Sequence, residues 1–220
     1  GASGYALSAN SGFIPNGVPY YKNTPANIYN LATAKLMLDA AGYKDVNGDG
    51  IREDTNGSAL TVTLLTRDKV AGELIKEYLE KAGLKVEYKF ASDLNAWVEL
   101  KDAHAYDIAY NGITAKGMMM DSGWATGYFA SNTLGAGKLQ NVDDPVFLEL
   151  CAKIATTPDG DELKALISDL QDYYSDNMPG IALYWSTDVT PINTEIDGWY
   201  ISKATGILNE INLLSMHPAN

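Results

Sequence analysis

The strongest constraint on the fold is a pair of alternating segments that flank one helical segment. Residues 60–66 (LTVTLLT) and 84–90 (LKVEYKF) alternate apolar and polar side chains and are rich in β-branched and aromatic residues, as strands are. Residues 69–82 place their apolar side chains on one helical face, and Gly83 follows as a stop signal. A strand, a helix and a strand with short joints form a parallel pair through a right-handed crossover.

The rest of the chain continues this pattern. We expect helices over residues 31–41, 94–101, 144–156 and 161–176, and strands over residues 106–111 and 181–185. The predicted fold class is therefore α/β, a mixed sheet with a parallel core and helices on both faces. We divide the chain into an extended segment (1–29), an α/β lobe (30–190) and a tail (191–220) in which we expect strand-like pieces and no helix.

Charge and motif content exclude several function classes. The chain has 220 residues and a net charge of −12, and it contains no clustered Lys and Arg, so we expect no nucleic-acid partner. It contains no GxSxG, HExxH, P-loop or CxxC motif, and we expect no enzymatic activity. The single cysteine, Cys151, lies in an apolar helical pattern and is interpreted as a buried structural thiol.

The stretch KDVNGDGIRED has the spacing of a calcium-binding loop. Alternate positions carry oxygen-bearing groups, and the carbonyl of the seventh residue completes the arrangement that calcium favours. The candidate ligands are Asp45, Asn47, Asp49, Ile51 (through its carbonyl) and Glu53. Position 12 departs from the pattern, because Asn56 stands where a bidentate acid belongs, and a strand rather than a helix follows.

A structural turn is the alternative for the same residues. Asp and Asn side chains accept hydrogen bonds from nearby backbone N–H groups, and Gly48 and Gly50 can adopt a positive φ. Calcium is therefore one of two hypotheses for this loop, and no other cofactor is expected.

Five stretches resemble one known family. They are ATAKLMLDAAGYKDVNGDGIRE, AGLKVEYKF, NAWVELKDAHAYDIAYNG, DDPVFLEL and DELKALISDLQDYYSDNMPGIALYW, in this order. Together they resemble the dipeptide-, oligopeptide- and nickel-binding family of extracytoplasmic solute-binding proteins of ABC importers, over about residues 10–200. The resemblance implies that this chain is the C-terminal lobe of a two-lobed fold of the type II periplasmic-binding-protein kind.

The resemblance also implies a function and partners. The expected ligand is a peptide-like or other small molecule, gripped between this lobe and the N-terminal lobe of the same protein. The expected membrane partner is an ABC permease, and the expected location is extracytoplasmic, with a lipid anchor on the full-length protein. The rival hypothesis is a calcium-stabilised extracellular module that binds carbohydrate or mediates adhesion.

The resemblance places the ligand-binding residues mainly after residues 106–111. Peptide-binding members carry a Gly-Trp-x-Ala-Asp-like stretch there, but this chain has Ile113 at the aromatic position and Lys116 at the acidic one. This reversal weakens the case for a free-amine peptide and favours an anionic or uncharged ligand. The candidate ligand-binding residues are Asn111, Thr114, Lys116, Asp121, Trp124, Tyr128, Trp97 and His104. For each aromatic residue, packing in a core is the competing interpretation.

Overall fold

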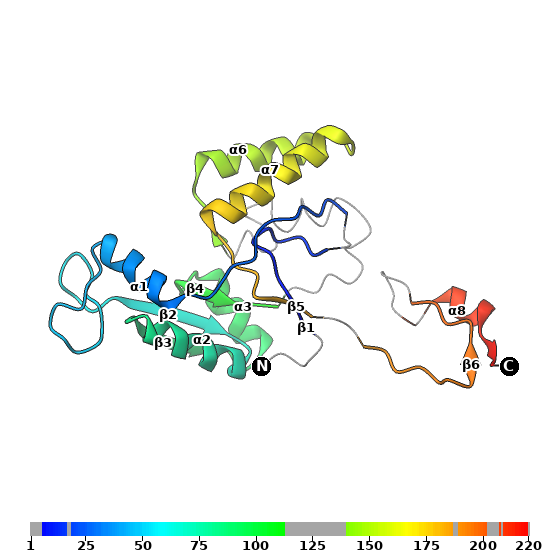
Figure 1. The fold of residues 1–220 in the computed structure, drawn as a ribbon, viewed down its shortest axis with the longest axis horizontal. Coiled ribbons are helices and arrows are strands. Elements are labelled where there is room, and N and C mark those ends of the chain that lie inside the picture. The colour runs from blue at the N-terminus through cyan, green and yellow to red at the C-terminus, as the bar shows by residue number, and fades with distance from the viewer. Residues whose placement is uncertain are drawn as a thin grey trace. The chain divides into compact units, whose positions relative to one another are not determined.

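The computed structural model describes residues 6–16, 19–112, 140–186, 189–201, 207 and 209–219, and it divides the chain into two compact units (Figure 1). The first unit spans Ile28–Gly112. The second unit combines Ala2–Asn27 with Ile113–Asn220. The first unit is thus continuous in sequence, whereas the second is assembled from two segments.

A three-stranded parallel sheet forms the centre of the first unit. Its strands are β2 (Thr61–Thr66), β3 (Lys85–Phe90) and β4 (Ile108–Tyr110), in the order β3-β2-β4. Thr66 at the end of β2 pairs in register with Phe90 on one side and Tyr110 on the other. All three strands therefore end at the same edge, and the predicted parallel pair is confirmed.

Two helices connect these strands. Helix α2 (Lys69–Lys81) joins β2 to β3, and helix α3 (Leu94–Asp102) joins β3 to β4. The two connections run in opposite directions across β2, so right-handed crossovers place the helices on opposite faces of the sheet. Each helix begins at an aspartate whose carboxylate accepts a backbone N–H three residues later, from Ala71 to Asp68 and from Ala96 to Asp93, both at 3.0 Å.

Gly72 allows α2 to approach the sheet closely. A Cβ atom at this position would lie 2.5 Å from both Thr66 Cγ2 and the Tyr88 hydroxyl. Only a residue without a side chain fits there, although glycine lowers the intrinsic stability of a helix. The glycine therefore sets the distance between α2 and the strands that it covers.

Helix α1 (Leu31–Ala40) precedes the sheet and buries none of its residues. Asn30 caps it by accepting the Thr33 N–H at 3.0 Å, and Gly42 follows its end with a φ of +93°. A ten-residue helix is marginal in isolation, so contacts with neighbouring residues must hold it in place.

The second unit is built around a helical hairpin. Helices α6 (Pro145–Thr156) and α7 (Asp161–Asn177) pack with the N-terminal segment. The buried core consists of Phe13, Ile14, Phe147, Cys151, Ile154, Leu163, Ile167, Leu170 and Tyr174. Cys151 is buried, as predicted, and burial raises the pKa of its thiol to about 11.

The side chain of Gln171 fastens the N-terminal segment to α7. It is fully buried, donates through Nε2 to the Tyr20 carbonyl at 2.8 Å and accepts the Lys22 N–H at 3.1 Å. These bonds satisfy backbone groups that lie about 150 residues away in the sequence. The Gln171 side-chain amide therefore satisfies two backbone groups that would otherwise need a neighbouring strand as their hydrogen-bond partner.

Two short antiparallel ladders complete the second unit. They pair β1 (Ala6–Ser8) with β5 (Tyr184–Ser186), and β6 (Ile196–Asp197) with β7 (His217–Pro218). The tail also contains helix α8 (Glu210–Ser215), so the expectation of a tail without a helix is wrong. Asn209 caps this helix, and the buried Asn212 within it accepts the Tyr200 N–H and donates to the Ile207 carbonyl. These local hydrogen bonds stabilise a helix too short to give a periodic apolar pattern.

No helix within the described ranges is long and apolar enough to cross a lipid bilayer.

The predicted division of the chain into an extended segment (1–29), an α/β lobe (30–190) and a tail (191–220) stays a prediction.

Gly72→Ala should destabilise the protein by about 1–3 kcal/mol, because the added methyl group overpacks the contact with Thr66 and Tyr88. Chemical denaturation followed by circular dichroism measures this change. Glu73→Ala, on the exposed face of the same helix, is the matched control and should change stability by less than about 0.5 kcal/mol. A stabilising effect of Gly72→Ala, which an unobstructed helix would show, contradicts the packing described here.

Candidate functional site

The carboxyl ends of the three parallel strands form the candidate ligand-binding edge. In open α/β sheets, ligands bind outside the carboxyl ends of the strands, where connections leave in opposite directions. Here the connections after β2 and β3 diverge across the sheet, and the strands end in register at Thr66, Phe90 and Tyr110. Arg67 and Asn111, the residues that follow Thr66 and Tyr110, are both exposed.

Arg67 is the notable charge at this edge. It makes no ion pair or hydrogen bond with any residue that the structure describes. The pKa of Asp93 lies below its ordinary value mainly because the Ala96 N–H donates to the carboxylate, and the positive charge of Arg67 adds to this effect. Arg67 is thus an exposed guanidinium that an anionic group could approach.

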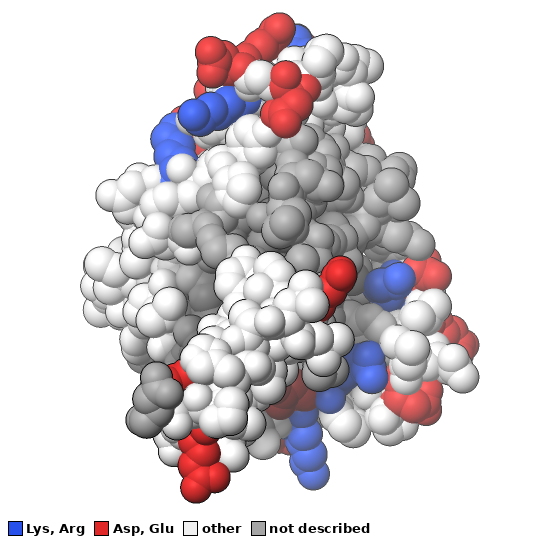
Figure 2. Space-filling model, turned by 90° about the vertical axis from the view of Figure 1, so that its right-hand side faces the viewer, with Lys and Arg blue, Asp and Glu red and all other residues white. Residues whose placement is uncertain are grey.

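Charges elsewhere are mixed in sign. On the face drawn in Figure 2, Lys and Arg side chains lie among Asp and Glu side chains, without a continuous basic patch among the residues shown in blue, red or white. At the candidate edge, Arg67 is an exposed cation that could bind an anionic group, and it was not among the predicted site residues. Its position directly after a parallel strand is the signal that could have identified it.

The predicted ligand-binding residues occupy different places. Asn111 is exposed at the carboxyl end of β4, whereas His104 is exposed on the segment that enters β4 and has a φ of +48°. Trp97 is only 6% exposed and belongs to the buried residues of the first unit. The other candidates, Thr114, Lys116, Asp121, Trp124 and Tyr128, lie outside the described residues, and the ligand-binding set stays a prediction.

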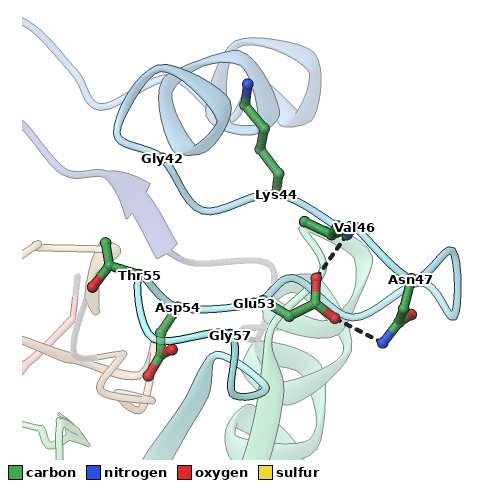
Figure 3. A pocket seen from close by; sticks show the side chains of 8 residues that line it. All are labelled: Gly42, Lys44, Val46, Asn47, Glu53, Asp54, Thr55 and Gly57. Carbon is green, nitrogen blue, oxygen red and sulfur yellow. Dashed lines mark hydrogen bonds between the residues drawn. The ribbon is translucent and has the colours of Figure 1, made fainter.

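The acidic turn gathers three carboxylates, and one of them, Glu53, lines an open pocket (Figure 3). One oxygen each from Asp45, Asp49 and Glu53 lies within 4.8 Å of the others, a spacing that a metal ion could bridge. Gly48 and Gly50 have φ angles of +80° and +91°, the backbone conformation expected of the structural turn.

The carboxylates of the turn also have hydrogen-bond donors within the turn itself. Asp45 accepts the N–H groups of Gly48 at 2.7 Å and Gly50 at 2.9 Å. Glu53 accepts the Val46 N–H at 2.7 Å and the Asn47 amide at 2.8 Å, as the dashed lines in Figure 3 show.

Asp49 completes the same set. It accepts the Ile51 N–H at 2.8 Å and the Asn47 amide at 3.2 Å. The Asn47 amide group thus lies between two carboxylates, where a calcium ligand would instead present an oxygen. The turn is closed by its own donors, which is the arrangement of a structural Asx turn.

Arg52 connects this turn to two helices. Its side chain is buried, with Nε donating to the Ala82 carbonyl at 2.9 Å and Nη1 donating to the Tyr43 carbonyl and to Asp39, each at 2.5 Å. Ala82 follows the end of α2, and Tyr43 lies just beyond the end of α1. A guanidinium at the ends of two helices is favoured both by their unpaired carbonyls and by their dipoles.

Arg52→Met should destabilise the protein by about 1–3 kcal/mol, because it leaves the Ala82 and Tyr43 carbonyls without their donor. Urea denaturation measures the loss. Arg67→Met removes an equal charge from an exposed position and should change stability by less than about 0.5 kcal/mol. Equal effects of the two substitutions would show that the contacts of Arg52 do not stabilise the turn.

Calcium should change the melting temperature very little, because the carboxylates of the turn already accept internal hydrogen bonds. Thermal melts in calcium and in chelator provide the measurement. Asn47→Asp replaces the central amide with a carboxylate and should make the melting temperature depend on calcium. A shift of several degrees in the unchanged protein would favour the calcium-stabilised module instead.

Comparisons with known proteins agree with this fold. A family model described as bacterial extracellular solute-binding proteins, family 5 Middle, matches residues 2–135, which is more than half of the chain. No curated protein sequence matches the chain. Among solved structures, the chain is similar to the oligopeptide-binding protein AppA from Bacillus subtilis in complex with a nonapeptide, with 21% identity and a TM-score of 0.70. That match covers 99% of this chain and 43% of AppA.

Two further structures show the same fold with other ligands. A mannohexaose-bound periplasmic oligopeptide-binding protein of an ABC transporter from Thermotoga maritima is 23% identical with a TM-score of 0.65, over 88% of this chain and 39% of that one. NikA from Staphylococcus aureus in complex with Ni(L-His)2 is 20% identical with a TM-score of 0.64, over 91% and 41%.

The chain spans about two fifths of the length of these proteins. Their fold is that of type II periplasmic binding proteins, and the predicted α/β class with a parallel sheet between helices is confirmed. The resemblance inferred from the five sequence stretches is likewise confirmed by the family model. This chain belongs to the bacterial extracellular solute-binding proteins of family 5.

Proposed function

We propose that this chain is the C-terminal lobe of a protein that captures a small solute outside the cytoplasm for an ABC importer. Family membership and the similarity to about two fifths of longer solute-binding proteins support this proposal. The structural observation that best supports the proposal is the edge at which β2, β3 and β4 all end. Arg67 and Asn111 are exposed at this edge. A second lobe would close over this edge and bury the solute.

One exposed cation at this edge and one position in the sequence favour a solute with an anionic group. Arg67 has no ion-pair partner among the described residues, and Lys116 stands where peptide-binding members carry an acid. A guanidinium matches the geometry of a carboxylate through two parallel hydrogen bonds. The similar structures hold a nonapeptide, mannohexaose and Ni(L-His)2, so peptides, oligosaccharides and metal–amino-acid complexes are the classes to test.

Exposed apolar side chains support a partner lobe. Leu213 and Leu214 of α8 are 85% and 81% exposed, and Ile28 at the start of the first unit is 87% exposed. The adjacent leucines of α8 would together form an apolar surface of the kind that a partner covers, whereas Ile28 is a single exposed side chain. We propose that the N-terminal lobe of the same protein covers them.

The location follows from the same proposal. The family is extracellular, and the full-length protein would act at the outer face of the membrane that holds its permease. We include a lipid anchor in the proposal. The upstream coding sequence tests it, because a signal peptide with a lipobox cysteine is expected and its absence would remove the anchor.

The chain alone should bind solute far more weakly than the full-length protein, because it holds one side of the cleft. Calorimetric titration of both proteins with a tripeptide pool, with mannohexaose and with nickel–histidine tests this expectation. Full-strength affinity of the isolated chain for any of these probes would contradict the two-lobed mechanism.

Arg67→Gln in the full-length protein should weaken binding of a carboxylate-bearing probe by about 10–100-fold, the loss expected when a charged hydrogen-bond partner is removed. Lys85→Gln is the matched control, because Lys85 is an exposed cation at the amino end of β3 and should leave affinity unchanged. Calorimetric titration with the tripeptide pool measures the affinity of both variants. Equal affinities would remove Arg67 from the proposed site.

A further inference from the structure

Asn-Gly pairs are the weakest points of a protein towards deamidation. The glycine nitrogen attacks the asparagine Cγ, a succinimide forms and ammonia leaves, and water then opens the ring to aspartate or isoaspartate. Glycine permits this attack because it has no Cβ to obstruct the ring. The structure describes both residues of three such pairs, which are Asn47–Gly48, Asn56–Gly57 and Asn111–Gly112.

The pair Asn47–Gly48 is held by hydrogen bonds at every reacting group. The Gly48 N–H donates to Asp45 at 2.7 Å, and the Asn47 side chain donates to Asp49 and Glu53 and accepts the Asp49 N–H at 2.8 Å. The Asn47 Cγ cannot rotate towards the Gly48 nitrogen without breaking these bonds. The structure thus opposes ring closure at this pair.

The pair Asn56–Gly57 is held in a similar way. The Gly57 N–H donates to the Asp54 carbonyl at 3.0 Å, and the Asn56 N–H donates to the Asp54 carboxylate at 2.8 Å. Ring closure again requires the Gly57 N–H to leave its acceptor and the Asp54 turn to open.

The pair Asn111–Gly112 has none of these restraints. Both residues are exposed, and neither makes a hydrogen bond with any part of the chain that the structure describes. A Cβ atom at Gly112 would meet nothing within 4 Å, as at Gly48 and Gly57, so the three pairs differ in their hydrogen bonds and not in free space. We propose that Asn111 is a site of spontaneous deamidation, whereas the folded structure protects Asn47 and Asn56.

The product would change the charge of the candidate ligand-binding edge. Thr66 and Tyr110 are register partners on neighbouring strands, so the next residues, Arg67 and Asn111, leave the sheet side by side. A new carboxylate at position 111 would compete with an anionic solute for Arg67. This consequence rests on the proposed function, whereas the deamidation itself does not.

Peptide mapping by mass spectrometry tests the chemistry. The full chain is incubated at mildly alkaline pH, once folded and once unfolded in urea, and the conversion rate at each of the three asparagines is measured. The ratio of the unfolded rate to the folded rate should be close to one for Asn111 and several-fold higher for Asn47 and Asn56. Protection of Asn111 equal to that of the other two overturns the proposal.

Two variants serve as controls for the cause of protection. Gly112→Ala should slow conversion at Asn111 in both states, because its methyl group obstructs the ring. Asp45→Ala removes the acceptor of the Gly48 N–H and should raise the folded rate at Asn47 several-fold. A folded rate at Asn47 that stays unchanged in Asp45→Ala contradicts the protection mechanism. None of these rate measurements involves a solute, so their outcome is independent of the binding experiments.

Discussion

The first unit depends on a single buried cation. The guanidinium of Arg52 satisfies carbonyls at the ends of α1 and α2 and pairs with Asp39, and its stem lies against Gly83. A buried charge is costly unless hydrogen-bond partners surround it. The Arg52 guanidinium therefore favours the arrangement in which the carbonyls at the ends of α1 and α2 point towards it. Because α1 buries no residue of its own, this contact gives it the tertiary support that its length does not.

The same region gives a physical reason for the acidic turn. Arg52 lies inside the turn, and its backbone N–H donates to the Gly83 carbonyl while its own carbonyl accepts the Leu60 N–H. The turn is therefore hydrogen-bonded to Leu60, the residue that precedes β2. Internal hydrogen bonds of Asp45, Asp49 and Glu53 hold the remaining residues, so the sequence pattern of a calcium loop is accounted for by local structure. Calcium binding at this turn stays a hypothesis.

Much of the fold could be predicted from local patterns. The periodicity of residues 60–90 predicts the β2–α2–β3 unit, and glycines and aspartates mark its joints. The hydrogen bonds of Gln171 and Arg52 could not be predicted, because they depend on which backbone carbonyls tertiary packing leaves unpaired. Helix α8 was missed for a related reason, since its stability comes from two asparagines rather than from an apolar face. Asn111 was a sequence prediction and lies exposed after β4, whereas Arg67 was missed although it directly follows the predicted strand at residues 60–66. The sequence could not show that the two residues follow register partners on neighbouring strands.

The fastening of the N-terminal segment by Gln171 has a consequence for the order of folding. The second unit joins segments from both ends of the chain, and the first unit is inserted between them. During synthesis, the inserted unit is complete once Gly112 has left the ribosome, but residues 20–22 must wait for α7 to emerge. Closing so long a loop carries an entropic cost that local contacts do not. The polypeptide should therefore pass through a stage in which one unit is native and its early segment is still unpaired, and this stage is the one most exposed to proteases and chaperones.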